Sequence, residues 1–248
     1  MKRNNKHRVA VFLTMLGLIL TPATLFASTT NATMRRDADQ IQRTNNAVDV
    51  LTNLIRTPDR GIPRSLLDEA EGIAVIPHVV GAAFGIGGRW GKGLISVREA
   101  NGRWSPPAFI ELTGGSFGFQ IGAEATEVVL VFTGRQGVDA LLNSKLKLGA
   151  DASIAAGPVG RSAGASTDWR LKAAVYSYSQ SKGLFAGIAL DGAVISVDNH
   201  ANRKVYGRHA SANNILVRQT VRPSRVTEPF VAALDRYSPA TASSRSYR

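Results

Sequence analysis

The sequence predicts an α+β protein, a single compact domain with a glycine-rich, mostly antiparallel sheet, an N-terminal helix and a mid-chain helix. Two observations lead to this fold class. Residues 81–122 contain 11 glycines in 42 positions, interleaved with short β-type runs, a composition that disfavours helices. Segments with helical spacing of apolar residues flank this region. A length of 248 residues suits one full-sized domain.

The first helix is predicted from Asp37 to Arg56, because apolar residues recur there at helical spacing and Pro58 ends the pattern. Such an apolar stripe suits packing against a sheet or contact with lipid acyl chains, and the sequence leaves both open. A capping-box pattern that starts at Ser65 predicts a short second helix through Ala70. The stripe of the first helix includes Ile41, Val48, Leu51 and Ile55.

The strands are predicted from short apolar or alternating runs. Residues 117–124 alternate large side chains with glycine and polar residues, which predicts one strand with a nearly bare face. Residues 136–148 have the spacing of the mid-chain helix, and Gly149 suits its end. The other strands are expected at 73–76, 94–97, 109–112, 128–132, 171–179, 184–190 and 193–197.

The folded domain is expected to span residues 28–207, followed by a basic, partly disordered extension at 208–248. Within this extension, residues 215–221 predict one more strand, and the apolar residues of 226–237 share one helical face. No internal repeat is apparent, because the spacing of the strands is irregular.

Residues 1–27 have the pattern of a secretory signal peptide. Four basic residues precede an apolar run from Val9 to Leu20, Pro22 breaks the run, and Ala27 suits cleavage. An uncleaved anchor is the alternative, but polar residues interrupt a span that would need about 20 apolar positions. We therefore expect an exported protein, periplasmic or secreted, that associates peripherally with a membrane. The chain has no cysteine, so disulfides are excluded.

The net charge of +12 is unevenly distributed along the chain. Residues 28–199 hold 17 basic and 16 acidic side chains, whereas residues 200–248 hold 9 basic and 2 acidic ones. A protein that reads nucleic acid usually carries its positive charge on the folded body. We therefore expect no nucleic-acid partner.

One enzymatic motif is present but lies in the wrong context. Residues 114–118 match G-x-S-x-G, with Ser116 as the nucleophile and downstream histidines in an order that a catalytic triad allows. The motif needs a helix directly after the serine, and the residues after Ser116 alternate as a strand instead. The histidines are not paired at metal-ligand spacing, so we predict no catalytic residue, metal or cofactor.

Cations and aromatic residues near apolar surface offer a binding site instead. Taken singly, each cation is best explained as solvated surface charge, but together with an amphipathic helix they form the pattern of a membrane-surface element. Acidic residues on the same helix weaken its attraction to anionic lipid. The candidate lipid-binding residues are Arg35, Arg36, Arg43, Arg56, Arg60, Arg89, Trp90, Lys92 and Lys182.

Several sequence blocks between residues 38 and 207 together form the pattern of a known family. They are Gly72–Pro77, Phe84–Gly88, Trp104–Phe109, Gly115–Gly122, Gly149–Asp151, Ala156–Arg161, 176–192, Asn202 and Tyr206–Gly207. In these blocks, which run in family order, the chain resembles the SYLF family of lipid-binding domains. The block at 115–122 includes Ser116, which favours a structural role for that serine.

The resemblance implies a non-catalytic α+β domain that binds phospholipid head groups, with actin as a further ligand of some eukaryotic members. Because an exported protein would not meet actin, we carry over the lipid binding only, with anionic phospholipids of the envelope as the expected partner. The resemblance also makes 176–192 a hairpin that turns at Lys182 and Gly183. The alternatives are an assembly module whose glycine-rich sheet docks an envelope protein and, more remotely, a hydrolase that uses Ser116.

Overall fold

The computed structural model describes residues 23–57, 61–84, 86–117, 122–158, 173–181, 184–187 and 190–239. The chain divides into two units, residues 1–36 and 37–248. Helix α1 (Ala23–Arg56) begins in the first unit, and the other helices and strands belong to the second. Most of the expected signal peptide, residues 1–22, lies outside the described residues.

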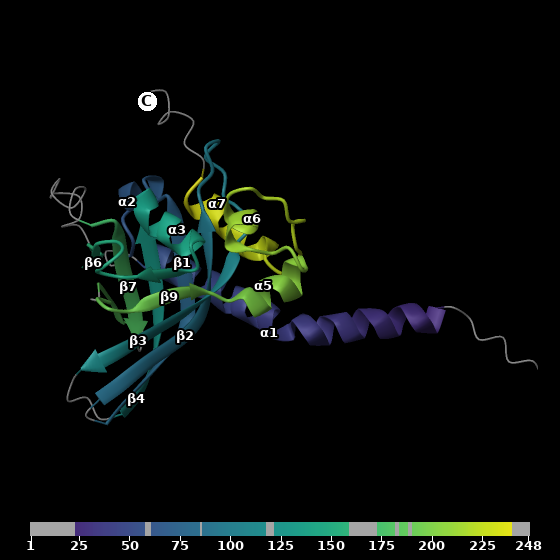
Figure 1. The fold of residues 1–248 in the computed structure, drawn as a ribbon, viewed down its shortest axis with the longest axis horizontal. Helices are drawn as coiled ribbons and strands as arrows, with labels where there is room; N and C mark the ends of the chain where they lie inside the picture. The colour runs from purple at the N-terminus through teal and green to yellow at the C-terminus, as the bar shows by residue number, and fades with distance from the viewer. Residues whose placement is uncertain are drawn as a thin grey trace, which may run out of the picture. The chain divides into compact units, whose positions relative to one another are not determined.

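The second unit is built on a sheet whose described part has nine strands (Figure 1). The order is β5-β9-β3-β2-β1-β4-β7-β6, with β8 also paired to β7, and every pair except β6 with β7 is antiparallel. The predicted fold class is therefore confirmed. The strands are β1 (Gly72–Phe84), β2 (Ile86–Val97), β3 (Ala108–Phe117), β4 (Gly122–Phe132), β5 (Lys145–Lys147), β6 (Ile154–Ala156), β7 (Val175–Ser181), β8 (Leu184–Gly187) and β9 (Val194–Val197).

Helices cover both faces of the sheet, because successive residues of each strand point to opposite sides and both sides are apolar. Ile73 and Val75 of β1 join one buried cluster, and Ala74 and Ile76 join another. The first cluster lies on what we name the α1 face, which also holds α2 (Arg64–Asp68), α5 (Asn199–Tyr206) and α7 (Glu228–Tyr237). The second lies on the α3 face, with α3 (Arg135–Leu142) and α6 (Ala212–Leu216).

The apolar stripe of α1 packs against the sheet. Residues 47, 50, 51 and 54 are between 0% and 4% exposed and belong to the cluster on the α1 face. Of the two roles that the sequence left open for this stripe, the structure therefore shows packing on the sheet for residues 37–56. Among the described residues, no helix combines the length and hydropathy of a membrane span.

Strand β1 carries a bulge at Pro77, although it lies in the interior of the sheet. Its register shifts there against both neighbours, β2 and β4. Proline has no amide hydrogen to donate, so an interior strand tolerates it only at such an irregularity. The bulge presses β1 against Gly93 of β2, where a Cβ atom would lie 2.2 Å from the carbonyl oxygen of Val75 and 2.9 Å from the Cα of Ile76.

We expect Gly93→Ala to lower the free energy of unfolding by about 1–3 kcal/mol or more, because the atoms in the way belong to the backbone and cannot rotate aside. Gly88→Ala is the matched control on the same strand, since the nearest atom to its added Cβ, the carbonyl oxygen of Gly114, would be 3.9 Å away. Urea unfolding of the two variants measures the difference. Equal midpoints would contradict the close approach at the bulge.

Three element predictions need correction. The mid-chain helix ends at Leu142 rather than 148, because Ser144 adopts a φ of 88°, and residues 145–147 form β5. The segment predicted as a strand at 215–221 begins as helix α6, whose first turn the Ser211 hydroxyl caps by accepting from the Asn214 amide. The alternation at 117–124 belongs to two strands: β3 and β4 are separated in the sheet by β2 and β1, and residues 118–121 lie outside the described part.

The packed region also continues beyond residue 207, where the sequence placed a boundary. Helix α6 contributes Ile215 and Leu216 to the core on the α3 face, and α7 contributes Phe230 and Leu234 to the core on the α1 face. All four side chains are at most 1% exposed. The helix predicted within 226–237 is confirmed as α7.

The hairpin predicted at 176–192 is present as the antiparallel pair β7 and β8, with Ser181 opposite Leu184. Its turn, residues 182–183, lies outside the described residues.

Candidate functional site

Strand β2 carries three of the predicted site residues, and they point to different sides of the sheet. Trp90 and Lys92 lie on the α1 face because they keep the alternation of buried Leu94, whereas Arg89 lies on the opposite face. Trp90 is 45% exposed and Arg89 is also exposed. The Lys92 ammonium lies 5.3 Å from the centre of the Trp90 ring and 3.7 Å from Oε1 of Glu111.

A row of exposed residues runs across the sheet at the level of Trp90. Val80 of β1 lies directly opposite Trp90, and Thr113 of β3 lies opposite it on the other side. Val80 is 49% exposed, so two large apolar side chains stand side by side, each about half exposed. Among the described residues, Val217 is the other large apolar side chain with comparable exposure, at 44%. We name the pair of Val80 and Trp90, with Lys92 beside them, the β2 patch.

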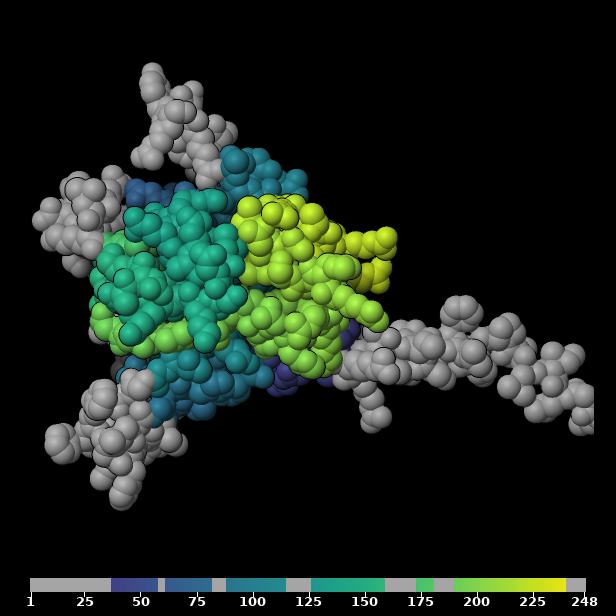
Figure 2. Space-filling view, in the orientation of Figure 1, coloured from purple at the N-terminus to yellow at the C-terminus, as the bar shows by residue number. Residues whose placement is uncertain are grey.

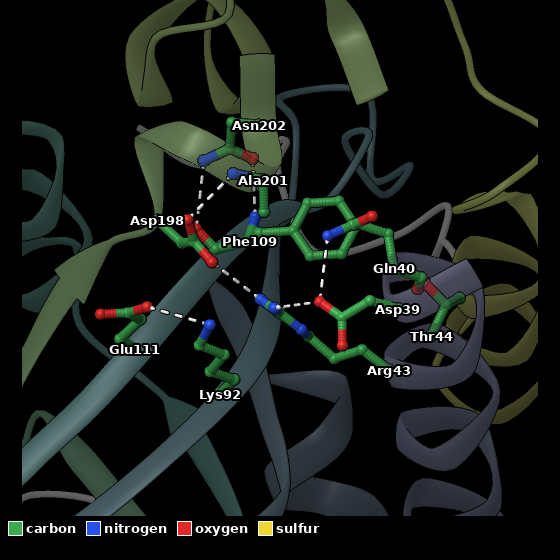
Figure 3. Close-up of polar contacts among 10 residues, drawn as sticks. All are labelled: Asp39, Gln40, Arg43, Thr44, Lys92, Phe109, Glu111, Asp198, Ala201 and Asn202. Carbon is green, nitrogen blue, oxygen red and sulfur yellow. Dashed lines mark hydrogen bonds and ion pairs between the residues drawn. The ribbon is translucent and has the colours of Figure 1, made fainter. Parts of the chain in front are cut away.

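Arg43 lies close to this patch but is enclosed (Figure 3). Its guanidinium is 3.0 Å from Oδ2 of Asp198 and 3.3 Å from Oδ2 of Asp39, and it lies 5.2 Å from the centre of the Phe109 ring. The side chains of Arg43 and Asp198 are only 5% and 8% exposed. Arg43 was predicted to hold lipid phosphate, but its charge is directed into the protein, so we leave it out of the proposed surface.

Asp198 connects this ion pair to the start of α5. Its Oδ1 accepts a hydrogen bond from the Ala201 amide at 2.9 Å, which makes it the N-cap of the helix. Burial raises the pKa of the Asp198 carboxyl, but the Ala201 amide, Arg43 and the nearby charge of Lys92 outweigh burial, so the pKa lies below its ordinary value of 3.8. The carboxylate is therefore ionised at neutral pH.

Asn202 fixes α5 against the N-terminal end of β3. Its side-chain oxygen accepts a hydrogen bond from the Phe109 amide at 2.8 Å, and its side-chain NH2 donates to the Phe109 carbonyl at 3.1 Å. The Asn202 side chain thus makes the pair of hydrogen bonds that the backbone of an adjacent strand would make. Asn202 is fully buried. These contacts hold α5, and the segment after it, at a defined place beside the sheet.

A second polar group lies where α1 crosses β1 and β4. Asn46 of α1 is 3.2 Å from Nε2 of His78, and Glu127 of β4 lies near both His78 and Asp49. Oε2 of Glu127 is buried and has no hydrogen-bond partner among the residues that the structure describes. Burial raises the pKa of the Glu127 carboxyl, and the Asp49 charge adds to this against the opposing effect of His78.

The other predicted site residues are not brought to the β2 patch. Arg56 lies in the exposed last turn of α1 beside Tyr237, whose phenol pKa is lowered by a hydrogen bond from Thr52 and also by Arg56. Arg35 and Arg36 lie in α1, and their side chains are outside the described part. Arg60 and Lys182 also lie outside the described residues.

The sequence analysis missed a structural clamp around Arg98. The Arg98 guanidinium stacks 4.3 Å from the Trp104 ring and donates to the carbonyl oxygens of Ala70 and Leu67. It also donates to the hydroxyl of Ser238, directly after α7. Trp104 Nε1 donates to the Ser238 carbonyl at 2.9 Å. No local pattern could have identified these partners of Arg98, which lie up to 140 residues from it in the chain.

The enzymatic alternative gains no support from the local structure. Ser116 lies inside β3, paired with Gly87 of β2, and the next described element is another strand, β4. The strand, turn and helix that aim a nucleophilic serine are therefore absent from the described residues. Within the same residues, no group of three or more histidine, aspartate or glutamate side chains could hold a metal ion.

Comparison with known proteins gives one family and several relatives. A family model described as "Ysc84: Las17-binding protein actin regulator" matches residues 113–237. That range includes α6 and α7, in agreement with their buried side chains.

The relatives are eukaryotic. The chain is 34% identical to human SH3 domain-containing YSC84-like protein 1 over 174 residues, which is 70% of this chain and 51% of the relative. It is 37% identical to the Xenopus laevis protein of the same name over 175 residues, 70% of this chain and 52% of the relative. It is 36% identical to LAS seventeen-binding protein 3 of Saccharomyces cerevisiae over 189 residues, 75% of this chain and 41% of the relative. The chain thus spans about half the length, or less, of these relatives.

Proposed function

The chain belongs to the Ysc84 family, the SYLF family that its sequence resembles, and we propose that it is a non-enzymatic binding protein. We further propose that it docks on anionic phospholipid surfaces. The names of its relatives describe binding and regulation, which supports the non-enzymatic part. The lipid ligand is our own proposal.

The β2 patch is the observation that carries the proposal. Trp90 has a large apolar ring with one polar N–H group, a combination suited to the boundary between acyl chains and head groups. Lys92 beside it is partly exposed, so its ammonium would lie at the level of the lipid phosphates, although Glu111 at 3.7 Å offsets part of its charge. A full positive charge there attracts an anionic surface by about 1 kcal/mol. Val80 extends the apolar area to the neighbouring strand.

The sequence supports placing this interaction in a cell envelope. If residues 1–27 act as a signal peptide, the protein is exported and meets the outer surface of the inner membrane or another envelope membrane. Anionic lipids of that envelope are then the expected ligand, and the protein is peripheral to the membrane.

We expect Trp90→Ala to weaken binding to vesicles of phosphatidylglycerol and phosphatidylethanolamine by about tenfold, since it removes roughly 1.5 kcal/mol of apolar transfer. Gln136→Ala is the control, because it shortens an exposed side chain of α3 that belongs neither to the patch nor to the basic segment after α5. Vesicle co-sedimentation measures both variants, with neutral phosphatidylcholine vesicles alongside. Equal losses in the two variants would argue against the patch, and no binding of the unaltered protein to anionic vesicles would refute the lipid ligand.

A protein ligand is the second candidate, and the names of the relatives favour it. Human and yeast relatives are named for SH3 domains and for binding to Las17, which is a protein. An exposed tryptophan is also a common anchor at protein interfaces. If Trp90→Ala leaves vesicle binding unchanged but abolishes capture of a protein from the native envelope, the second candidate replaces the first.

A further inference from the structure

The longest stretch without a carboxylate in the second half of the chain runs from Asn199 to Thr227. It contains no aspartate or glutamate but six lysines and arginines and two histidines. The preceding part of the presumed mature chain, in contrast, has nearly equal numbers of acidic and basic residues. From the sequence alone, most of this positive charge falls in a partly disordered extension after residue 207, where the cations of 203–225 would add long-range attraction to an anionic bilayer.

In the structure this stretch is part of the folded domain. Ala201, Ile215 and Leu216 are at most 1% exposed and anchor it to the two cores. Hydrogen bonds connect its parts to one another. The Tyr206 hydroxyl lies 2.9 Å from that of Thr227, the Asn214 side-chain amide donates to the His209 carbonyl at 2.7 Å, and the Thr220 amide donates to the Asn214 carbonyl at 3.0 Å.

The cations of this stretch all lie at the surface. None of them takes part in an ion pair within the described residues. Figure 2 shows α5, α6 and the segment after them as one continuous green to yellow surface on the viewed face. The six exposed residues, which we name the basic surface, are Arg203, Lys204, Arg208, Arg218, Arg222 and Arg225.

Such a surface has an electrostatic cost that a bound anion would remove. Exposed like charges close together in the chain repel one another, and no carboxylate of the same stretch offsets them. The charges are spread along the exposed sides of α5 and of the turns around α6, and no two of them share a described partner. A single phosphate would require donors that converge on one point, whereas a broad sheet of phosphates matches this spacing.

We propose that the basic surface is a second docking surface for an anionic lipid bilayer, separate from the β2 patch. The inference rests on the proposed function, because it names a further contact with the same kind of ligand. It assigns the two surfaces different roles. The basic surface supplies salt-sensitive attraction, and the β2 patch supplies apolar contact that depends little on salt.

The test compares two variants that remove the same number of charges. Arg218→Gln, Arg222→Gln and Arg225→Gln are combined in one full-length chain. The control combines Arg103→Gln, Lys145→Gln and Lys147→Gln, which are exposed and lie outside the stretch. Binding to vesicles of phosphatidylglycerol and phosphatidylethanolamine is measured over a range of salt concentrations, and thermal unfolding checks that both variants remain folded.

We expect the first variant to bind about a hundredfold more weakly at low salt, about fivefold for each charge removed, and its binding to fall less steeply with added salt. The control variant should lose much less. Equal losses in the two variants would overturn the inference in favour of net charge, while the β2 patch proposal would stand.

Two other results have distinct meanings. If the unaltered protein ignores anionic vesicles, the proposed function fails and the inference with it. If the first variant keeps its vesicle binding but loses binding to duplex DNA that the unaltered protein shows, the basic surface serves nucleic acid and the lipid assignment is overturned.

Discussion

Truncation after Gly207 is expected to unfold the domain rather than to remove an extension. The removed part contains Ile215 and Leu216 of the core on the α3 face, and Phe230 and Leu234 of the core on the α1 face. Loss of a single buried phenylalanine costs about 3–5 kcal/mol, and whole domains are stable by only about 5–15 kcal/mol. The truncated chain should therefore lose its cooperative unfolding transition.

The Arg98 clamp adds to this effect. Without residue 238, the Trp104 indole loses its acceptor, and the Arg98 guanidinium loses the carbonyl and hydroxyl of Ser238 but keeps the carbonyls of Leu67 and Ala70. The loss of the acceptor of the buried indole N–H costs about 1–3 kcal/mol. The ends of α2 and β2 would then lose their link to the C-terminal part of the domain.

Circular dichroism with thermal and urea unfolding measures the outcome. Truncation after Pro239 is the control, because it keeps α7 together with the contacts of Ser238, and it should unfold like the full chain. Phe230→Ala tests the same packing by a milder change and should lower the free energy of unfolding by about 3–5 kcal/mol. A chain that ends at Gly207 and still unfolds cooperatively, at a similar midpoint, would show that α6 and α7 are dispensable.

Asp198→Asn is expected to lower the free energy of unfolding by about 3 kcal/mol. Both members of the Arg43–Asp198 pair are buried, and a buried charge that loses its partner costs about 3–5 kcal/mol. We take the lower end because Asp39, which is 69% exposed, still lies 3.3 Å from the Arg43 guanidinium. Asparagine caps a helix as well as aspartate, so the N-cap of α5 is preserved and the loss reports the ion pair.

A double variant separates the pair from the packing around it. Arg43→Met combined with Asp198→Asn removes both charges and keeps the bulk of the side chain over Phe109. It should recover most of the stability that Asp198→Asn loses, because no unpaired charge is left buried. If the double variant is as unstable as the sum of the two single variants, Arg43 and Asp198 do not act as a pair.

The pH dependence of stability provides a further check on Asp198. Its pKa is lower in the folded than in the unfolded chain, so its carboxylate contributes stability that is fully present above the ordinary value of 3.8. This contribution is lost as the pH falls through the lowered pKa of the folded state. Urea midpoints measured across the acid range check this. The stability of Asp198→Asn should fall less with decreasing pH than the stability of the unaltered protein, because the variant has no carboxylate at position 198 to protonate.

Much of the fold was predictable from local patterns. The glycine-rich region with short β-type runs predicted a sheet, and the stripe of residues 37–56 predicted α1, because periodicity reflects which side of an element is buried. The errors concern short elements. Helix α6 has only five residues, and at that length tertiary packing decides the conformation more than local preference does.

The candidate site was only partly predictable. A tryptophan between two cations drew attention to β2, and the structure places Trp90 and Lys92 together on its α1 face. Val80 was missed because its neighbour in space, Trp90, belongs to another strand, and the register that joins them cannot be read from either segment alone.

By itself, the sequence determined the family, the α+β fold class and the absence of disulfides, since these depend on composition, motif blocks and local periodicity. Only the tertiary structure decided which cations face the solvent. Arg43 and Arg218 have the same side chain. Asp198, 155 residues further along the chain, pairs with Arg43, while no carboxylate of the described residues pairs with Arg218. The reason is that the charge of a side chain follows from its type, whereas its partner and its exposure follow from how distant segments pack.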